Sequence, residues 1–207
     1  MIDILKTLAA LGLGYLLGSL NTAVLVGKAY GKDITAHGSK SAGLTNTLRV
    51  LGKSAAALVL VGDILKGIVA CLIGLRLGVY VQAGAAVECV SLLAAGAGAV
   101  VGHNWPVYFG FKGGKGMLTA AAVMLMVNWV MTLISFGLFV IVVAVSRYVS
   151  LGTISAAVFF VALSFVPSFG STLYFNVFAG LMAAMIIFKH RENIRRLLSG
   201  TENKLTF

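Results

Sequence analysis

The sequence has few charged residues, and acidic ones are scarcest. Asp, Glu, Lys and Arg make up 11% of the 207 residues, whereas soluble domains average about a quarter. Hydrophobic residues make up 59%, and they form long apolar runs along the whole chain. These runs leave no room for a soluble module, so the sequence predicts a single integral membrane domain over residues 1–207.

Cysteine is also scarce. The two cysteines, Cys71 and Cys89, lie in separate apolar runs, and we expect them to be buried free thiols that pack as small hydrophobes. No zinc-ligand spacing and no disulfide framework can be built from them. We therefore expect neither a metal ion nor a cofactor.

Several familiar catalytic motifs are missing. There is no Gly-x-Ser-x-Gly nucleophile elbow. None of His37, His103 and His190 is followed by Asp four or five residues later, which excludes the common His-x4-Asp acyltransferase pattern. Residues 111–116 lack the spacing and the final hydroxyl of a Walker A loop.

The apolar runs predict an all-α membrane protein, because a spanning helix needs about 20 apolar residues. Spans are expected at about residues 4–26, 54–76, 82–101, 151–166 and 172–189. The first contains Gly14 and Gly18, whose spacing lets helices pack closely. It is too long for a cleaved signal peptide, and no basic region precedes it. Residues 117–146 fit either one long helix or two spans that turn near Asn128.

The distribution of Lys and Arg favours two spans there, at about 117–128 and 131–146, which makes seven in all. The segments 27–53, 102–116 and 147–150 and the tail from Lys189 then lie on one side and hold most of the 16 Lys and Arg residues. The positive-inside rule places that side in the cytoplasm. We therefore expect the N-terminus outside and the C-terminus in the cytoplasm.

Residues 111–116 concentrate chemistry in a short stretch, with two lysines and three glycines. Glycine lets backbone N–H groups approach a ligand closely, and successive N–H groups form a concavity that attracts anions. Lysine adds a point charge suited to phosphate. The pattern predicts an oxyanion cradle, and the alternative is a plain basic loop that obeys the positive-inside rule.

Three further segments gather polar residues on the predicted cytoplasmic side: 37–49, 147–150 and 189–196. Their plain alternatives are a hydrophilic loop, a helix-connecting turn and a basic tail. If the tail is helical, His190, Asn193 and Arg196 share one face. The net charge of +10 suits an anionic substrate or anionic lipids. Nucleic acid is a poor fit, because the basic residues form short clusters between spans.

Two charged residues fall inside a predicted span. Asp63 and Lys66 lie three residues apart, and buried charges in a span usually pair or face a polar cavity. We expect mainly a structural ion pair close to the site, with a direct role as the alternative. Glu88 stands alone, and no role is assigned to it.

Four motifs occur in order along the chain, and together they resemble the bacterial acyl-phosphate:glycerol-3-phosphate acyltransferase family. The resemblance covers the whole chain, including Gly18-Ser19 and Asp63-x-x-Lys66-Gly67. The motifs are Gly38-Ser39…Gly43-x-Thr45-Asn46-x-x-Arg49, His103-x-x-Pro106…Phe111-Lys112-Gly113-Gly114-Lys115-Gly116, Tyr148-Val149-Ser150-Leu151 and His190-Arg191-Glu192-Asn193-Ile194-x-Arg196-Leu197.

The resemblance implies a seven-helix enzyme of the bacterial inner membrane with its active site facing the cytoplasm. Such enzymes move a fatty acyl chain from acyl phosphate, not acyl-CoA, to the 1-hydroxyl of sn-glycerol 3-phosphate. The products are lysophosphatidic acid and phosphate, in the first step of bacterial phospholipid synthesis. A soluble enzyme that makes acyl phosphate is a further candidate partner.

The resemblance also assigns site residues. Ser39, Gly113, Gly114 and Ser150 would hold the donor's phosphate. Arg49 and Lys112 would bind glycerol phosphate with Asn193 and His190 beside it, and Lys115 could serve either anion. The residues expected to take part in catalysis are Ser39, Arg49, Lys112, His190 and Asn193.

The chain departs from the family pattern in the first motif. Lys40-Ser41 stands where the family usually has Gly-Asn, and Leu44 replaces a usual Ala. The lost glycine restricts the backbone around Ser39.

Acyl phosphate is a mixed anhydride with a good leaving group, so positioning and electrostatic stabilisation can suffice without an acyl-enzyme. The base is either His190 or the donor's own phosphate. We favour the phosphate, because no carboxylate is evidently placed to orient His190. The rival classes are an organic-anion transporter, whose polar residues should lie near the bilayer midplane, and a non-catalytic lipid-binding scaffold.

Overall fold

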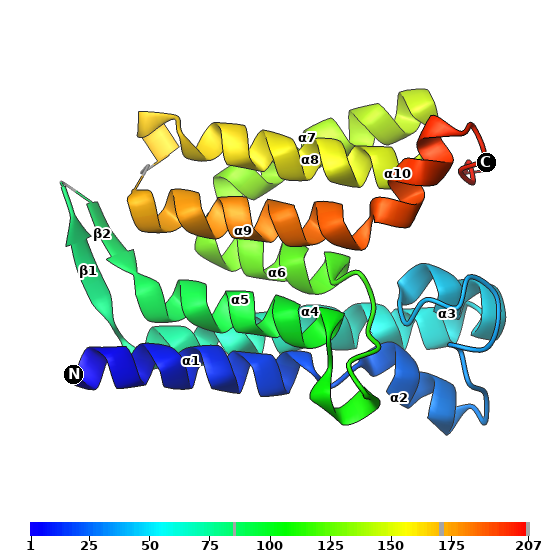
Figure 1. The fold of residues 1–207 in the computed structure, drawn as a ribbon, viewed down its shortest axis with the longest axis horizontal. Helices are drawn as coiled ribbons and strands as arrows, with labels where there is room; N and C mark the ends of the chain where they lie inside the picture. The colour runs from blue at the N-terminus through cyan, green and yellow to red at the C-terminus, as the bar shows by residue number, and fades with distance from the viewer. Residues whose placement is uncertain (85, 170–171, 206–207) are drawn as a thin grey trace. The chain divides into compact units, whose positions relative to one another are not determined.

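The computed structural model describes residues 1–84, 86–169 and 172–205 (Figure 1). This part of the chain is mostly α-helical, as predicted, and also contains one short two-stranded hairpin. It divides into two compact units. The first comprises Met1–Val81 and Cys89–Val127, and the second comprises Gln82–Glu88 and the described residues from 128 onward.

In the first unit, α1 packs against α4 and α5, and α4 also packs against α2, α3 and α6 (Figure 1). The helices of this unit are α1 (Ile2–Gly18), α2 (Thr22–Ala29), α3 (Leu44–Leu51), α4 (Lys53–Leu77), α5 (Val90–Asn104), the short 3-10 turn η1 (Val107–Phe109) and α6 (Met117–Val127).

In the second unit, α8 packs against α7 and α9, and α10 contacts both α8 and α9. The rings of Phe160 and Phe175 meet edge to face with their centroids 6.0 Å apart, which joins α8 to α9. The helices of this unit are α7 (Trp129–Ser146), α8 (Val149–Ser164), the 3-10 turn η2 (Pro167–Phe169), α9 (Leu173–Lys189) and α10 (Arg191–Leu198).

Three stretches of the described chain are long and apolar enough to cross a membrane: Ile2–Ala29, Lys53–Leu77 and Trp129–Ser146. The pair α9 and α10 passes the same test together, but it is bent by 60° at its break. α6 and α8 are shorter apolar helices. Seven spans with the predicted orientation therefore stay a prediction.

The predicted turn near Asn128 is confirmed, and the residue itself explains it. Asn128 is the N-cap of α7, and its Oδ1 accepts a hydrogen bond of 3.0 Å from the backbone N–H of Met131. Asparagine is among the best N-cap residues because its side chain satisfies a free amide of the first turn. The second span and the last two are helices within a few residues of the predicted bounds.

The third predicted span begins too early. Tyr80–Ala83 (β1) and Ala86–Cys89 (β2) pair as a hairpin, and helix α5 begins only at Val90. Residue 85 lies outside the described residues. Tyr80, Val81 and Val87 belong to the aromatic and β-branched types that favour strands, and the left-handed Gly84 (φ +67°) turns the chain.

Two further segments differ from the sequence prediction. The first apolar run breaks after Gly18, and α2 begins at Thr22 with Asn21 as its N-cap. The polar segment 27–53, expected to be a loop, contains the helix α3. Asn21 starts α2 by accepting from the N–H of Val24, and α3 is a short amphipathic helix within an otherwise polar segment.

Close helix packing through Gly14 and Gly18 is confirmed, and α5 supplies the matching glycines. A Cβ placed on Gly14 or Gly18 would lie 2.1 or 2.0 Å from the carbonyl oxygens of Ala95 and Ala99. A Cβ placed on Gly98 or Gly102 would likewise lie 2.2 or 2.1 Å from the carbonyl oxygens of Leu11 and Tyr15. The backbones of α1 and α5 therefore touch along a seam of four glycines, which we call the glycine seam.

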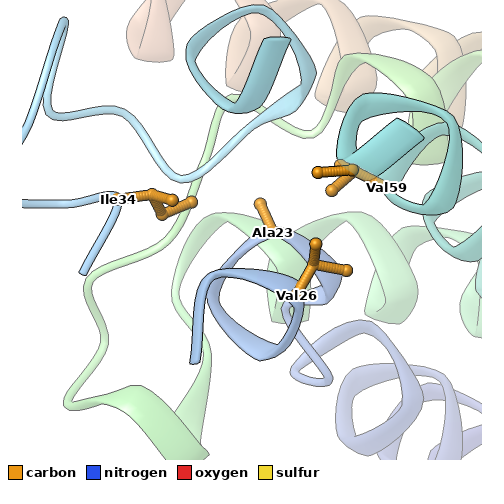
Figure 2. Packing of buried hydrophobic residues seen from close by; sticks show 5 residues of the cluster. Ala23, Val26, Ile34 and Val59 are labelled. Carbon is orange, nitrogen blue, oxygen red and sulfur yellow. The ribbon is translucent and has the colours of Figure 1, made fainter. Parts of the chain in front are cut away.

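A small apolar cluster fixes the start of the first polar segment. Ile34 is 1% exposed and reaches from the chain after α2 toward Ala23 (Figure 2). Val26 of α2 and Ala55 and Val59 of α4 complete the cluster. Burying a side chain of this size stabilises by about 1.5–3 kcal/mol, so Ile34 anchors the segment that leads into the first motif.

Candidate active site

Asn46 organises the loop around Ser39. This buried side chain accepts a 2.8 Å hydrogen bond from the backbone N–H of Ser39, and its amide donates to the carbonyls of Ile34 (2.8 Å) and His37 (3.1 Å). Gly38 has φ +59°, and a Cβ there would lie 2.4 Å from Asn46 Oδ1. The backbone at residues 34–39 is thus fixed from beneath, while the Ser39 side chain is exposed.

Lys40 occupies the left-handed region with φ +56°. A side chain in this conformation costs about 1–2 kcal/mol relative to the right-handed region. The backbone therefore keeps the shape that glycine would favour, even though the sequence places a lysine there.

The next predicted cation follows on α3. Arg49 lies in the last turn of that short helix and is exposed.

Gly113 and Gly114 lie tightly against two other segments of the first unit. A Cβ on Gly113 would be 2.1 Å from the His103 carbonyl oxygen. A Cβ on Gly114 would be 2.4 Å from both the Ala42 carbonyl oxygen and His103 Nε2. The approach to Ala42 brings residues 37–49, which we call the first-motif loop, against residues 111–116, which we call the glycine loop.

Three N–H groups of the glycine loop have protein acceptors. Phe111 N–H donates to the Pro106 carbonyl at 2.9 Å, Lys112 N–H to the Phe109 carbonyl at 3.2 Å, and Gly114 N–H to the His103 carbonyl at 3.2 Å. These hydrogen bonds fix the shape of the loop backbone.

Lys112 has an exposed side chain and lines a cavity of about 670 Å³ in the first unit. Lys28 and Lys32 line the same cavity. Lys115 is half-buried and takes part in interactions within the protein. The cavity is thus lined by three lysines and one acidic residue, Asp33, and its net positive charge favours anions.

In the second unit, Ser150 and Asn193 meet at one carboxylate that the sequence did not indicate. Glu202 Oε1 accepts from Ser150 Oγ at 2.8 Å and from Asn193 Nδ2 at 2.6 Å. Its Oε2 accepts from Arg196 Nε at 2.7 Å. The third and fourth motifs are therefore joined. Of the three residues expected on one helical face, Asn193 and Arg196 lie on α10, whereas His190 is its N-cap at the bend after α9.

These bonds control the charge of Glu202. Partial burial raises the pKa of this carboxyl, but the hydrogen bonds from Asn193, Arg196 and Ser150 outweigh burial and hold the pKa below its usual value of 4.5. Hydrogen bonds to the ionised form favour that form, so Glu202 is an anion at neutral pH.

His190 is buried where α9 meets α10, and its Nδ1 lies 2.8 Å from the carbonyl oxygen of Ile186. Because a carbonyl only accepts, Nδ1 of His190 carries a proton and donates to Ile186. This hydrogen bond helps to orient the ring.

The predicted ion pair in α4 is present. Lys66 Nζ lies 2.9 Å from Asp63 Oδ1, and both side chains are buried. Lys66 Nζ also lies 2.8 Å from Nδ1 of His103, a partner that the sequence did not indicate because 37 residues separate the two positions.

Comparison with known proteins decides the family. A family model described as glycerol-3-phosphate acyltransferase matches residues 8–200. The chain belongs to this family. A relative named glycerol-3-phosphate acyltransferase from Thermoanaerobacter pseudethanolicus is 43% identical over 194 residues, covering 93% of this chain and 92% of the relative. One of the same name from Clostridioides difficile is 42% identical, covering 92% and 91%.

The fold of this glycerol-3-phosphate acyltransferase matches solved structures of PlsY (YgiH), described as an integral membrane glycerol 3-phosphate acyltransferase. Its glycerol 3-phosphate form has a TM-score of 0.85 and 35% identity, covering 97% of this chain and 96% of that one. The lysophosphatidic acid form has a TM-score of 0.83 and 35% identity, covering 97% and 95%. The present chain is accordingly an integral membrane enzyme.

Three residues of this acyltransferase support the predicted site without having been assigned a role from the sequence. Asn46 holds the Ser39 loop, His103 contacts both cradle glycines, and Glu202 joins Ser150 to Asn193. Asn46 and His103 belong to the motifs that carried the resemblance. Glu202 was signalled only by being a rare acidic residue in a basic tail.

Proposed function

We propose that this acyltransferase uses acyl phosphate as its donor and transfers the acyl chain to the 1-hydroxyl of sn-glycerol 3-phosphate. The hydroxyl oxygen forms a bond to the acyl carbon, the bond between that carbon and the phosphate oxygen breaks, and lysophosphatidic acid and phosphate leave. The glycerol 3-phosphate and lysophosphatidic acid forms of the solved PlsY structures support this acceptor and product.

One observation carries the proposal: Ala42 of the first-motif loop lies against Gly114 of the glycine loop. Both substrates carry a phosphate, so the site needs N–H donors and cations close together. We propose that Ser39 and the glycine loop bind the donor's phosphate. Arg49 and Lys112 bind glycerol 3-phosphate, and Lys115 serves either anion.

Ser150, Asn193 and His190 of the second unit are proposed to serve the same reaction. Ser150 contributes to holding the donor's phosphate, while Asn193 and His190 contribute to binding the acceptor. Ser150 has one hydroxyl proton, and Glu202 accepts it. Donation from Ser150 to a phosphate therefore requires that this hydroxyl turn away from Glu202.

The proton of the glycerol hydroxyl goes to the donor's phosphate in this proposal. Nδ1 of His190 donates to the carbonyl of Ile186, so only Nε2 of this ring could serve as the base instead. If His190→Ala keeps most of kcat while Ser39→Ala and Arg49→Ala abolish activity, the phosphate serves as base. Complete loss of kcat with unchanged KM in His190→Ala would assign the role to His190.

We further propose a single domain of seven spans in the bacterial inner membrane, with the N-terminus outside and the active site facing the cytoplasm. A soluble enzyme that makes acyl phosphate is the proposed supplier of the donor. Lys32 and Arg76 are both exposed, and they fall on opposite sides in this topology. A membrane-impermeant maleimide added to intact cells should label Arg76→Cys and spare Lys32→Cys; the reverse pattern would refute the orientation.

The activity itself is tested with purified protein in detergent. Labelled glycerol 3-phosphate is supplied with acyl phosphate, and separately with acyl-CoA. We expect a labelled lipid product from acyl phosphate alone. Product from acyl-CoA alone would refute the donor assignment. No product from either, together with uptake of the labelled anion into proteoliposomes, would favour an organic-anion transporter.

A further inference from the structure

The buried charges in α4 make contacts beyond the ion pair. Lys66 Nζ faces the Asp63 carboxylate at 2.9 Å, Nδ1 of His103 at 2.8 Å and the carbonyl oxygen of Leu20 at 3.2 Å. Asp63 is 2% exposed, His103 3% and Lys66 7%. One ammonium group therefore ties together α4, the end of α5 and the break between α1 and α2.

Lys66 and Asp63 both face Nδ1 of His103. An ammonium group has three donors and no acceptor, so a protonated Lys66 donates to Nδ1. Asp63 Oδ1 lies 3.6 Å from the same ring nitrogen. Asp63 supplies the opposite charge that a buried ammonium group needs, because an unpaired buried charge is costly.

The Nε2 edge of His103 lies against the glycine loop. A Cβ on Gly114 would be 2.4 Å from Nε2, and the His103 carbonyl accepts from Gly114 N–H at 3.2 Å. The same carbonyl would be 2.1 Å from a Cβ on Gly113. His103 thus contacts both cradle glycines through its ring and its backbone, and Lys66 sets the orientation of the ring.

We propose that Asp63, Lys66 and His103 form a positioning network for the phosphate-binding glycine loop. His103 is a positioning residue that supports the backbone of Gly113 and Gly114 from behind, and Lys66 and Asp63 act through it. The buried charges of α4 therefore serve binding as well as folding. This inference rests on the proposed function of the loop.

A second set of contacts ties α4 to the other end of the same loop. Thr119 Oγ1, in the first turn of α6, donates to the Asp63 carbonyl at 3.1 Å. A Cβ on Gly67 would lie 3.0 Å from the Thr119 carbonyl oxygen. Residues 63–67 thus hold both the segment before the glycine loop and the helix after it.

Two substitutions of His103 separate the parts of the network. His103→Asn keeps an acceptor near the Nδ1 position for Lys66 but removes the ring edge from Gly114. We expect its KM for glycerol 3-phosphate or acyl phosphate to rise about 10- to 100-fold, by analogy with the loss of a residue that orients a metal ligand. His103→Gln places an amide near the Nε2 position and should recover part of this loss.

The ion pair is tested by removing both charges together. Asp63→Asn with Lys66→Met avoids an uncompensated buried charge and still leaves His103 without its donor. We expect this double variant to fold and to show the same rise in KM. Folding is followed by the thermal exposure of the buried thiols of Cys71 and Cys89 to a thiol-reactive dye.

Ser91→Ala is the matched control for a merely structural role. Ser91 is a buried residue of the same unit that accepts from Val79 N–H and donates to the Gly74 carbonyl. Its loss should lower the unfolding temperature without changing either KM. If His103→Asn or the double variant is folded and keeps both KM values within about threefold of wild type, the positioning role is refuted.

A binding readout separates failure of this inference from failure of the proposed function. Glycerol 3-phosphate and inorganic phosphate should raise the unfolding temperature of the wild type, since a ligand stabilises the state that binds it. This shift should be smaller in His103→Asn and unchanged in Ser91→Ala. An inactive wild type that shows this pattern would refute the proposed reaction and support the network, whereas equal shifts in all three would refute the network.

Discussion

Gly114→Ala is the most direct test of the glycine loop. The added Cβ would lie 2.4 Å from the Ala42 carbonyl oxygen and 2.4 Å from His103 Nε2. Cβ contacts shorter than about 3.4 Å are uncommon, so one partner must move by roughly 1 Å. One neighbour is backbone and the other is a buried ring held by Lys66, so we expect the loop itself to move.

A displacement of about 1 Å at a substrate-positioning group can lower the rate about 100-fold. We therefore expect kcat/KM for glycerol 3-phosphate to fall about 100-fold in Gly114→Ala, which corresponds to about 2.7 kcal/mol of transition-state stabilisation. The assay is initial-rate formation of labelled lysophosphatidic acid in detergent micelles, with glycerol 3-phosphate varied at saturating acyl phosphate.

Gly12→Ala is the matched control, because nothing lies within 4 Å of a Cβ there and Gly12 belongs to the same unit. It should keep kcat/KM and raise the unfolding temperature slightly, as expected for glycine in a helix interior. If Gly114→Ala is folded and keeps kcat/KM within about threefold of the control, the close packing of this loop does not govern binding and the reasoning is wrong.

Three further predictions concern the supports of the site. Lys40→Gly should raise the free energy of unfolding by up to about 1 kcal/mol, because relief of left-handed strain exceeds the entropy cost of glycine; denaturant titration would show no gain if the strain is absent. Asn46→Ala should lower the free energy of unfolding by about 1–3 kcal/mol, because the Ser39 amide is left unpaired. Asn46→Asp keeps that acceptor and should lower the free energy of unfolding by less. The folded state lowers the pKa of Glu202, so its ionised form stabilises the protein above about pH 4.5, and this stabilisation is lost as the pH falls through the pKa of the folded state. In Glu202→Gln the free energy of unfolding should no longer show this loss at acidic pH. An unchanged pH dependence would contradict the assignment.

Features that depend on nearby residues, or on how charge is distributed along the chain, could be predicted from the sequence. The turn at Asn128 follows from charge distribution, and the residue that forms it is a strong N-cap. The pairing of Asp63 with Lys66 follows from their spacing on one helix. The effect of the lost glycine also shows at the residue itself, because Lys40 takes the strained left-handed conformation.

Features that depend on distant contacts were not readable. Glu202 meets Ser150 across 52 residues, and Lys66 meets His103 across 37. Neither pairing leaves a periodic trace in the sequence. The start of α5 was missed for a different reason: an apolar run that forms a hairpin looks the same as one that begins a helix, and only β-branched and aromatic enrichment separates the two.

The glycine seam between α1 and α5 has a consequence for biosynthesis. During synthesis at about 5–20 residues per second, α1 is complete several seconds before α5, which begins only at Val90. For that interval the backbone carbonyls and glycines of α1 have no matching surface from α5. The Tyr15 carbonyl lies against Gly102, the residue next to His103, so the late arrival of α5 also delays the moment at which the glycine loop can take its final shape.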